Sequence, residues 1–182
     1  RNNFIARIKG LSGVGKTRLV LEALSSDDLK SKVVYFPRPE DFRNSNLLNR
    51  IIYDKDLEAI IVVDDCYVRE HDDLQNILKN RGDGIALITI SDDMVKATNQ
   101  TPIYHIDTLS QGSMEQLIRN EILGIQISLL DRIMQFAEGY PKIAVLLGEI
   151  FYHDSEYNSH EEFTLKDEYL MKKLISKRMI FH

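Results

Sequence analysis

The sequence predicts an α/β fold, a three-layer core with a five-stranded parallel sheet, followed by a helical subdomain. Two observations lead to this prediction. Over the first hundred or so residues, short apolar runs alternate with helical patterns, which is typical of a parallel sheet covered on both faces. From about residue 109 onward, strand-like runs stop and helical spacing takes over. We therefore expect two domains, residues 1–108 and 109–182, with a further module starting after about residue 160.

Five apolar runs are predicted to form the strands of the sheet. They are residues 4–8, 32–36, 59–63, 84–90 and 103–106. The third run is continuously apolar, as expected for a central parallel strand that is buried on both faces. Helices are predicted at residues 18–24, 41–52, 70–81, 113–123, 128–138, 141–153 and 165–180.

Length and composition exclude several classes of protein. The 182 residues allow one well-buried core, and the hydrophobic content of 43% is ordinary for a globular protein. No apolar run approaches the roughly 20 residues that span a bilayer. We find no signal peptide, and the single cysteine, Cys66, cannot form an internal disulfide, so we expect a cytoplasmic protein without a membrane partner. The net charge of −5 argues against nucleic acid as a partner. Because no Met opens the chain, we expect a fragment of a longer or processed polypeptide.

Residues 10–17 read Gly-Leu-Ser-Gly-Val-Gly-Lys-Thr and match the phosphate-binding pattern G-x-x-x-x-G-K-[ST]. The glycines permit a tight turn whose backbone N–H groups, with the positive end of the next helix, can hold a polyphosphate. Lys16 can reach the terminal phosphates, and the Thr17 hydroxyl can bind Mg²⁺. We expect a nucleoside triphosphate to be bound by Gly10, Ser12, Gly13, Val14, Gly15, Lys16, Thr17 and Arg18.

The third predicted strand ends in two acids, Asp64 and Asp65. A carboxylate at the C-terminal end of a parallel strand lies beside the phosphate loop, where open α/β sheets bind ligands. We expect Asp64 to hold Mg²⁺ together with Thr17, and Asp65 to act with Lys16 in catalysis by orienting or deprotonating a water. Asp65 is one methylene shorter than the Glu often found there, so the alternative that it only begins a loop stays open.

Two hydroxyls lie near the end of the fourth predicted strand, those of Thr89 and Ser91. If this strand lies between the first and the third, both face the γ-phosphate region, and Thr89 is the better candidate to sense a nucleotide. Ser91 fits equally well as the N-cap of a short helix that begins at Asp92.

The remaining candidates have mainly structural interpretations. Gly139 can take the left-handed conformation that ends one helix, and Pro141 suits the first turn of the next. The five histidines show no metal-ligand spacing, and we expect His105 and Cys66 to be core residues.

With these residues in place, the chain resembles the STAND class of signalling ATPases, which includes NB-ARC and AP-ATPase domains. The resemblance covers about residues 4–150 and rests on four elements. They are Gly-Val-Gly-Lys-Thr in the loop, Val-Val-Asp-Asp at the strand end, residues 106–110 leading into 115–118, and the Gly-x-Pro element within 137–144. The resemblance implies a P-loop NTPase fold with strand order 5-1-4-3-2 and a contact between Pro141 and the nucleotide. It also implies an inactive ADP-bound monomer and an ATP-bound homo-oligomer, in immune or antiphage defence or in transcription regulation.

Two features of the family are not recognised, an Arg after the sensor threonines and a winged-helix module with an ADP-binding His. The expected activity is slow Mg²⁺-dependent ATP hydrolysis, completed by an arginine from a neighbouring subunit. Candidates within this chain are Arg18, Arg38 and Arg43, and the sequence singles out none of them. Two alternatives stay open, a small-molecule or nucleotide kinase and a nucleotide-dependent scaffold without turnover. A kinase lid would need arginines, and those of the helical half are widely spaced.

Overall fold

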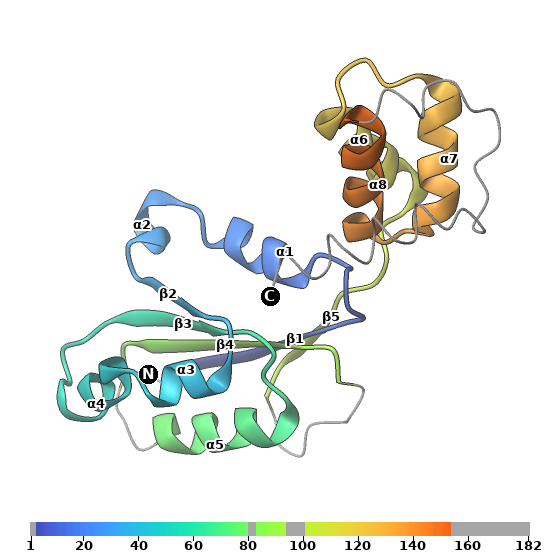
Figure 1. Cartoon of the computed structure of the whole chain (residues 1–182). Coiled ribbons are helices and arrows are strands. Elements are labelled where there is room, and N and C mark those ends of the chain that lie inside the picture. The colour runs from blue at the N-terminus through green and yellow to red at the C-terminus, as the bar shows by residue number, and fades with distance from the viewer. Residues whose placement is uncertain (1–2, 80–82, 94–100, 154–182) are drawn as a thin grey trace. The chain divides into compact units, whose positions relative to one another are not determined.

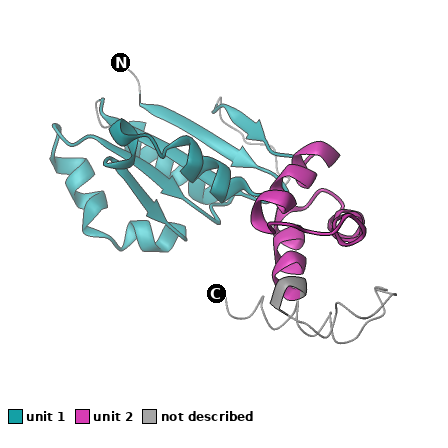
Figure 2. Cartoon of the chain, turned by 90° about the horizontal axis from the view of Figure 1, so that it is seen from above, with its two compact units in different colours: residues 1–107 teal, residues 108–182 magenta. Residues whose placement is uncertain are grey.

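The computed structural model describes residues 3–79, 83–93 and 101–153. It divides into two compact units, residues 1–107 and 108–182, which Figure 2 colours separately. The predicted helix at 165–180 and the further module after about residue 160 lie outside the described residues. Within the described ranges, no helix is long and apolar enough to cross a lipid bilayer.

The first unit is built on a parallel sheet of five strands in the order β2-β3-β4-β1-β5 (Figure 1). The strands are β1 (Phe4–Lys9), β2 (Val33–Phe36), β3 (Ala59–Val63), β4 (Ile85–Ser91) and β5 (Ile103–His105). Counted from β5 this order is 5-1-4-3-2, so the predicted fold class and strand order are confirmed. The phosphate loop follows β1 and the acid pair follows β3, and β4 lies between these two strands.

Helices cover both faces of the sheet and complete the three layers (Figure 1). They are α1 (Lys16–Ala23), α2 (Asp27–Lys30), α3 (Pro39–Arg43), α4 (Asn46–Tyr53) and α5 (Val68–Lys79). The single helix predicted at 41–52 is wrong, because the chain forms α3 and α4 there. The break falls at Ser45, whose backbone is extended and whose hydroxyl donates to the Phe42 carbonyl at 2.7 Å. This side-chain hydrogen bond takes the place of a backbone bond of a continuous helix, so α3 ends and α4 begins as a separate helix.

The two faces of the sheet have separate apolar layers. On one face Val20 of α1 packs with Val62 and Ile90, and these three side chains are buried. On the other face α3, α4 and α5 pack over alternate residues of the same strands, including Ile61 and Leu87. Successive strand residues point to opposite faces. Each strand position is therefore assigned to the α1 face or the α5 face, and this assignment decides where the polar side chains lie.

The second unit consists of three helices around a core of its own. They are α6 (Gln111–Glu121), α7 (Ile127–Ala137) and α8 (Pro141–His153), and their buried side chains include Met114, Ile118, Leu130, Ile133 and Leu147. Gly139 has a φ of 84° and follows the end of α7, as predicted, and Pro141 is the first residue of α8. A Cβ at Gly139 would lie 2.7 Å from the Thr108 Cβ, so the close approach of two backbone segments also requires glycine.

Candidate nucleotide-binding site

The phosphate loop leaves β1 in close contact with the segment that follows β5. The Ile106 N–H donates to the Lys9 carbonyl at 2.7 Å, immediately before the loop. A Cβ at Gly10 would lie 2.2 Å from the Ile106 carbonyl oxygen, which no side chain could tolerate. Within the loop Val14 is buried and anchors the turn, whereas Ser12 is exposed. The predicted loop residues thus form one turn, and the contacts with Ile106 hold the beginning of this turn in place.

Helix α1 begins without the acidic side chains that open its neighbours. Its N-cap is Gly15, in a left-handed conformation, and no side chain bonds to the cap. The first turn of α1 carries no acid, whereas α2 and α3 each have two. The first N–H groups of a helix have no partner within the helix and carry its positive end. This terminus of α1 is therefore suited to an anion.

The Lys16 ammonium folds back over the phosphate loop. It donates to the Gly10 carbonyl at 2.9 Å and to the Leu11 carbonyl at 3.0 Å. Burial lowers the pKa of Lys16, while nearby carboxylates act in the opposite direction. These carboxylates belong to Asp92, Asp64 and Asp65. The ammonium therefore lies between two loop carbonyls and three carboxylates, and a bound phosphate and cation would change these contacts.

Thr17 and Asp64, the two predicted Mg²⁺ residues, contact each other directly. The Thr17 hydroxyl donates to Asp64 Oδ2 at 2.6 Å. A hydroxyl and a carboxylate so close together are the hard oxygen ligands that Mg²⁺ takes alongside phosphates. The residues present thus fit the cation. Within the described ranges, no three His, Cys, Asp or Glu side chains form a metal site.

Tyr35 joins this pair, although the sequence analysis did not single it out. Its hydroxyl donates to the same Asp64 oxygen, Oδ2, at 3.0 Å, and burial raises the pKa of Tyr35. The other oxygen, Oδ1, accepts the backbone N–H of Asp65 at 2.9 Å. The bond could not be foreseen without knowing that β2 pairs with β3, where Tyr35 lies opposite Val62.

Asp65 has a left-handed backbone, with a φ of 47°. Asp and Asn adopt this conformation far more readily than longer residues. The left-handed backbone thus favours Asp at this position. Burial raises the pKa of Asp65, and the charges of Asp64 and Asp92 add to this effect, while Lys16 and Arg38 oppose it. A raised pKa suits a group that must accept a proton.

The arginine candidates differ in their surroundings. Arg18 of α1 is exposed and pairs with Glu22 at 3.6 Å, and Arg43 pairs with Asp73 at 3.2 Å. Arg38 is the candidate whose charge acts on Asp65 within the same unit.

The structure does not bring the Thr89 hydroxyl to the phosphate loop. Thr89 is fully buried on the α5 face, and its hydroxyl lies 2.8 Å from His71 Nδ1. Ser91 ends β4 and accepts a bond from Arg7 at 3.1 Å, and no helix begins at Asp92 or Asp93. The reason is the alternation of the strand, which gives Thr89 and Ser91 the same face as Leu87. A sensor role for Thr89 stays a prediction that this geometry does not favour.

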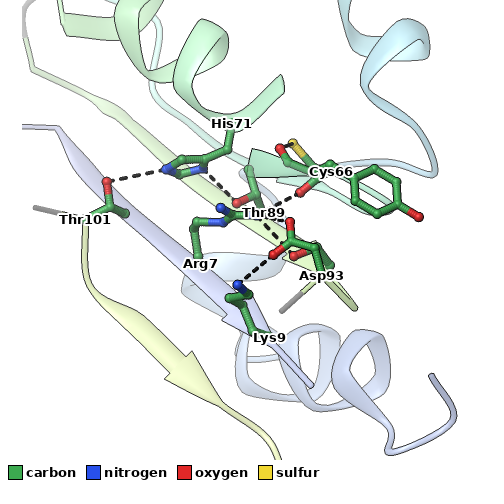
Figure 3. A network of polar contacts seen from close by, with 9 residues as sticks. Arg7, Lys9, Cys66, His71, Thr89, Asp93 and Thr101 are labelled. Atoms are coloured by element: carbon green, nitrogen blue, oxygen red, sulfur yellow. Dashed lines mark hydrogen bonds and ion pairs between the residues drawn. The ribbon is translucent and has the colours of Figure 1, made fainter. Parts of the chain in front are cut away.

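A buried cluster of charges lies under the C-terminal ends of β1 and β4 (Figure 3). Arg7 is 0% exposed, and its Nη2 donates to Asp93 Oδ2 at 3.0 Å, to the Ser91 hydroxyl and to the Cys66 carbonyl. Lys9 Nζ lies 2.6 Å from Asp93 Oδ1. We call Arg7, Lys9 and Asp93 the β1 charge cluster.

His71 lies beside this cluster and is itself buried (Figure 3). Its Nδ1 faces Thr89 and its Nε2 lies 3.4 Å from the Thr101 hydroxyl, which accepts a hydrogen bond from Gln75. Burial lowers the pKa of His71 to about 4, and the positive charge of Arg7 acts in the same direction. A histidine held in this way is a structural hydrogen-bonding residue at neutral pH.

The histidine and cysteine predictions had different outcomes. Cys66 is buried, as predicted, and burial raises the pKa of its thiol to about 12. The prediction for His105 is wrong: it ends the edge strand β5 and is exposed. His71 is the core histidine, and its spacing from Leu74 and Leu78 would have placed it on the buried face of the helix.

Protein stability should therefore fall on mild acidification. The unfolded His71 binds a proton near pH 6.5 and the folded one near pH 4, so its contribution is complete above pH 6.5 and is lost as the pH falls toward 4. Between pH 7 and pH 5 the loss should be about 2 kcal/mol. Urea unfolding at both pH values, for the wild type and His71→Gln, measures it. An unchanged pH dependence in the variant would assign the effect to other groups, such as Asp72 or Asp93, which also face His71.

The fold and the phosphate loop together define the class: this is a P-loop NTPase-like α/β fold. We describe two of the solved structures that are similar to it. One is a Signal Transduction ATPase with Numerous Domains (STAND) protein with a tetratricopeptide repeat sensor from Pyrococcus horikoshii, with TM-score 0.56 and 15% identity over 97% of this chain and 30% of that one. The other is C. elegans PCH-2, with TM-score 0.52 and 13% identity over 98% of this chain and 62% of that one. At such identities the likeness concerns the fold, and the chain spans less than two thirds of either protein. No protein-family model and no curated protein matches the sequence.

Proposed function

We propose that the chain is the nucleotide-binding core of a STAND-type signalling ATPase, a switch that binds ADP or ATP and hydrolyses ATP slowly. The observation that carries the proposal is the direct contact between Thr17 and Asp64 at 2.6 Å, beside the phosphate loop and Lys16. Thr17 belongs to the loop motif after β1, and Asp64 follows β3, which β4 separates from β1 in the sheet. This is the pair of oxygens that a Mg²⁺-nucleotide requires.

Each residue of the site then has a chemical task. The loop N–H groups and the first turn of α1 would bind the phosphates, and Lys16 would exchange two loop carbonyls for phosphate oxygens. Thr17 and Asp64 would hold Mg²⁺, which when bound neutralises charge between the phosphates. Asp65, with its raised pKa, would orient or deprotonate the attacking water. Slow turnover is expected because, among the described residues, Arg38 is the arginine whose charge acts on Asp65, and a second subunit would supply the arginine finger.

The switch itself is proposed from the family resemblance and the fold shared with a STAND protein. In this proposal the chain has two domains, residues 1–108 and 109–182, and Pro141 contacts the nucleotide. The ADP-bound protein is a monomer, and it forms a homo-oligomer when ATP binds. The proposal further includes other domains of a longer cytoplasmic chain, with a role in defence or in transcription regulation.

Calorimetric titration with ADP and with ATP, in the presence of Mg²⁺, tests the proposal. We expect the wild type to bind ADP tightly and Lys16→Ala to bind it about 100-fold more weakly, because the loss of a charge-assisted contact costs about 3 kcal/mol. Lys30→Ala is the matched control, since Lys30 is an exposed lysine of α2. If neither nucleotide binds to the wild type, the proposal is wrong.

Two further measurements separate the alternatives. Weak ADP binding with ATP consumption that depends on an added acceptor would favour a small-molecule or nucleotide kinase. Asp65→Asn preserves the left-handed backbone, because Asn also adopts it, and so changes only the chemistry. Slow ATP hydrolysis that is lost in Asp65→Asn supports the switch, whereas binding without turnover in both proteins supports a scaffold.

A further inference from the structure

The Asp64 carboxylate is held by hydrogen-bond donors from three different elements. Thr17 of α1 and Tyr35 of β2 both donate to Oδ2, at 2.6 and 3.0 Å. The Asp65 N–H, from the loop after β3, donates to Oδ1 at 2.9 Å. Thr17 lies in the phosphate loop motif and the Asp65 N–H is a backbone group. Tyr35 is therefore the one of the three donors whose side chain has no other assigned task.

Strand β2 fixes the position of Tyr35 relative to Asp64. The Phe36 carbonyl accepts the Asp64 N–H at 2.9 Å, which continues the pairing of β2 with β3 to the acid itself. Tyr35 points to the α1 face, because Val33 two residues earlier packs in the layer of α1. It thus reaches Asp64 from the same side as Thr17, and the residue is 38% exposed.

We propose that Tyr35 is a positioning residue of the Mg²⁺ site, which fixes the orientation of the Asp64 carboxylate and so sets the affinity for the cation. The inference rests on the proposed function, since it requires a Mg²⁺-nucleotide at Thr17 and Asp64. Without the Tyr35 hydroxyl, two donors instead of three hold the carboxylate, the Thr17 hydroxyl on Oδ2 and the Asp65 N–H on Oδ1, and its orientation is less tightly fixed. Loss of such an outer partner typically weakens metal binding by about 10- to 100-fold. Tyr35 acts through Asp64 and has no bond to the loop, so the affinity for nucleotide without metal does not depend on it.

The test compares Tyr35→Phe with the wild type in two binding measurements on the full chain. Phe keeps the ring and removes only the hydroxyl. Calorimetry with ADP in EDTA measures nucleotide binding without metal, and electron paramagnetic resonance with Mn²⁺ on the ADP-saturated protein measures metal binding. Tyr53→Phe is the control, because Tyr53 is 83% exposed at the end of α4. We expect unchanged ADP affinity in EDTA, Mn²⁺ affinity about tenfold weaker in Tyr35→Phe, and wild-type values for the control.

The outcomes separate this inference from the proposed function. Wild-type or tighter Mn²⁺ binding by Tyr35→Phe overturns the positioning role and leaves the nucleotide site intact. An equal loss of ADP binding in EDTA also overturns it, because the hydroxyl would then support the site as a whole. If the wild type itself binds no ADP, the proposed function fails, and the inference fails with it. A thermal unfolding curve of each variant confirms that all are folded.

Discussion

Gly10→Ala is expected to reduce ADP affinity by at least about 100-fold, because the phosphate loop would be displaced. The new Cβ would lie 2.2 Å from the Ile106 carbonyl oxygen and 3.2 Å from a methyl of Val14. The Ile106 backbone cannot easily withdraw, since its N–H donates to the Lys9 carbonyl at 2.7 Å. The loop must then move, and a shift of about 1 Å is enough to misalign its N–H groups. Calorimetric titration with ADP measures the loss.

A second glycine provides the matched control. Gly112 lies in α6, and a Cβ there meets nothing within 4 Å. Gly112→Ala should therefore leave ADP binding unchanged and raise the free energy of unfolding by about 0.5 kcal/mol, through the helical preference of Ala. Wild-type ADP binding by Gly10→Ala would mean that the loop is not held against Ile106.

Asp93→Ala is expected to lower the free energy of unfolding by about 3–5 kcal/mol. The side chains of Arg7 and Lys9 are 0% and 4% exposed, and the substitution leaves both cations buried without their carboxylate. Burial alone would raise the pKa of Asp93, but the hydrogen bond from Lys9 and the charge of Arg7 outweigh it and lower the pKa. The carboxylate is therefore charged at neutral pH. Since domains are stable by only about 5–15 kcal/mol, the loss should be evident in urea unfolding at pH 7.

An exposed ion pair gives the comparison for this prediction. Asp73 pairs with Arg43 at 3.2 Å, and their side chains are 57% and 37% exposed. Asp73→Ala should cost no more than about 1 kcal/mol, because water screens such pairs. Equal, small effects of the two substitutions would show that water replaces Asp93 beside Arg7 and Lys9.

The strands and helices that local sequence patterns determine could be predicted from the sequence. Apolar runs and the glycine-rich loop predicted all five strands and the helix that follows the loop, because both signals are contiguous in the chain. The strand order followed from the family resemblance, since no local pattern states which strands are neighbours. The break at Ser45 was missed because a single hydroxyl, bonded to Phe42, decides it.

The candidate site was less predictable, because part of it depends on pairing across the sheet. The contact of Tyr35 with Asp64 requires both the order and the register of β2 and β3. The burial of Thr89 on the α5 face was not predicted, although Leu87, two residues earlier and apolar, indicated that this face points to the core. One signal was overlooked. Arg7 and Lys9 interrupt the apolar run of a central strand, and charges there require a buried partner.

The β1 charge cluster fixes the register of β1 against β4, and with it the position at which the phosphate loop begins. Arg7 and Lys9 lie opposite Thr89 and Ser91 in the ladder, on the face where Asp93 can meet them. If β1 slipped by one residue against β4, every side chain would change faces, and two cations would enter the apolar layer of α1 without a counter-charge. A one-residue slip of β1 against β4 is therefore electrostatically unfavourable. Since the loop starts at the residue after Lys9, the cluster also determines where the phosphate loop lies relative to the end of β4.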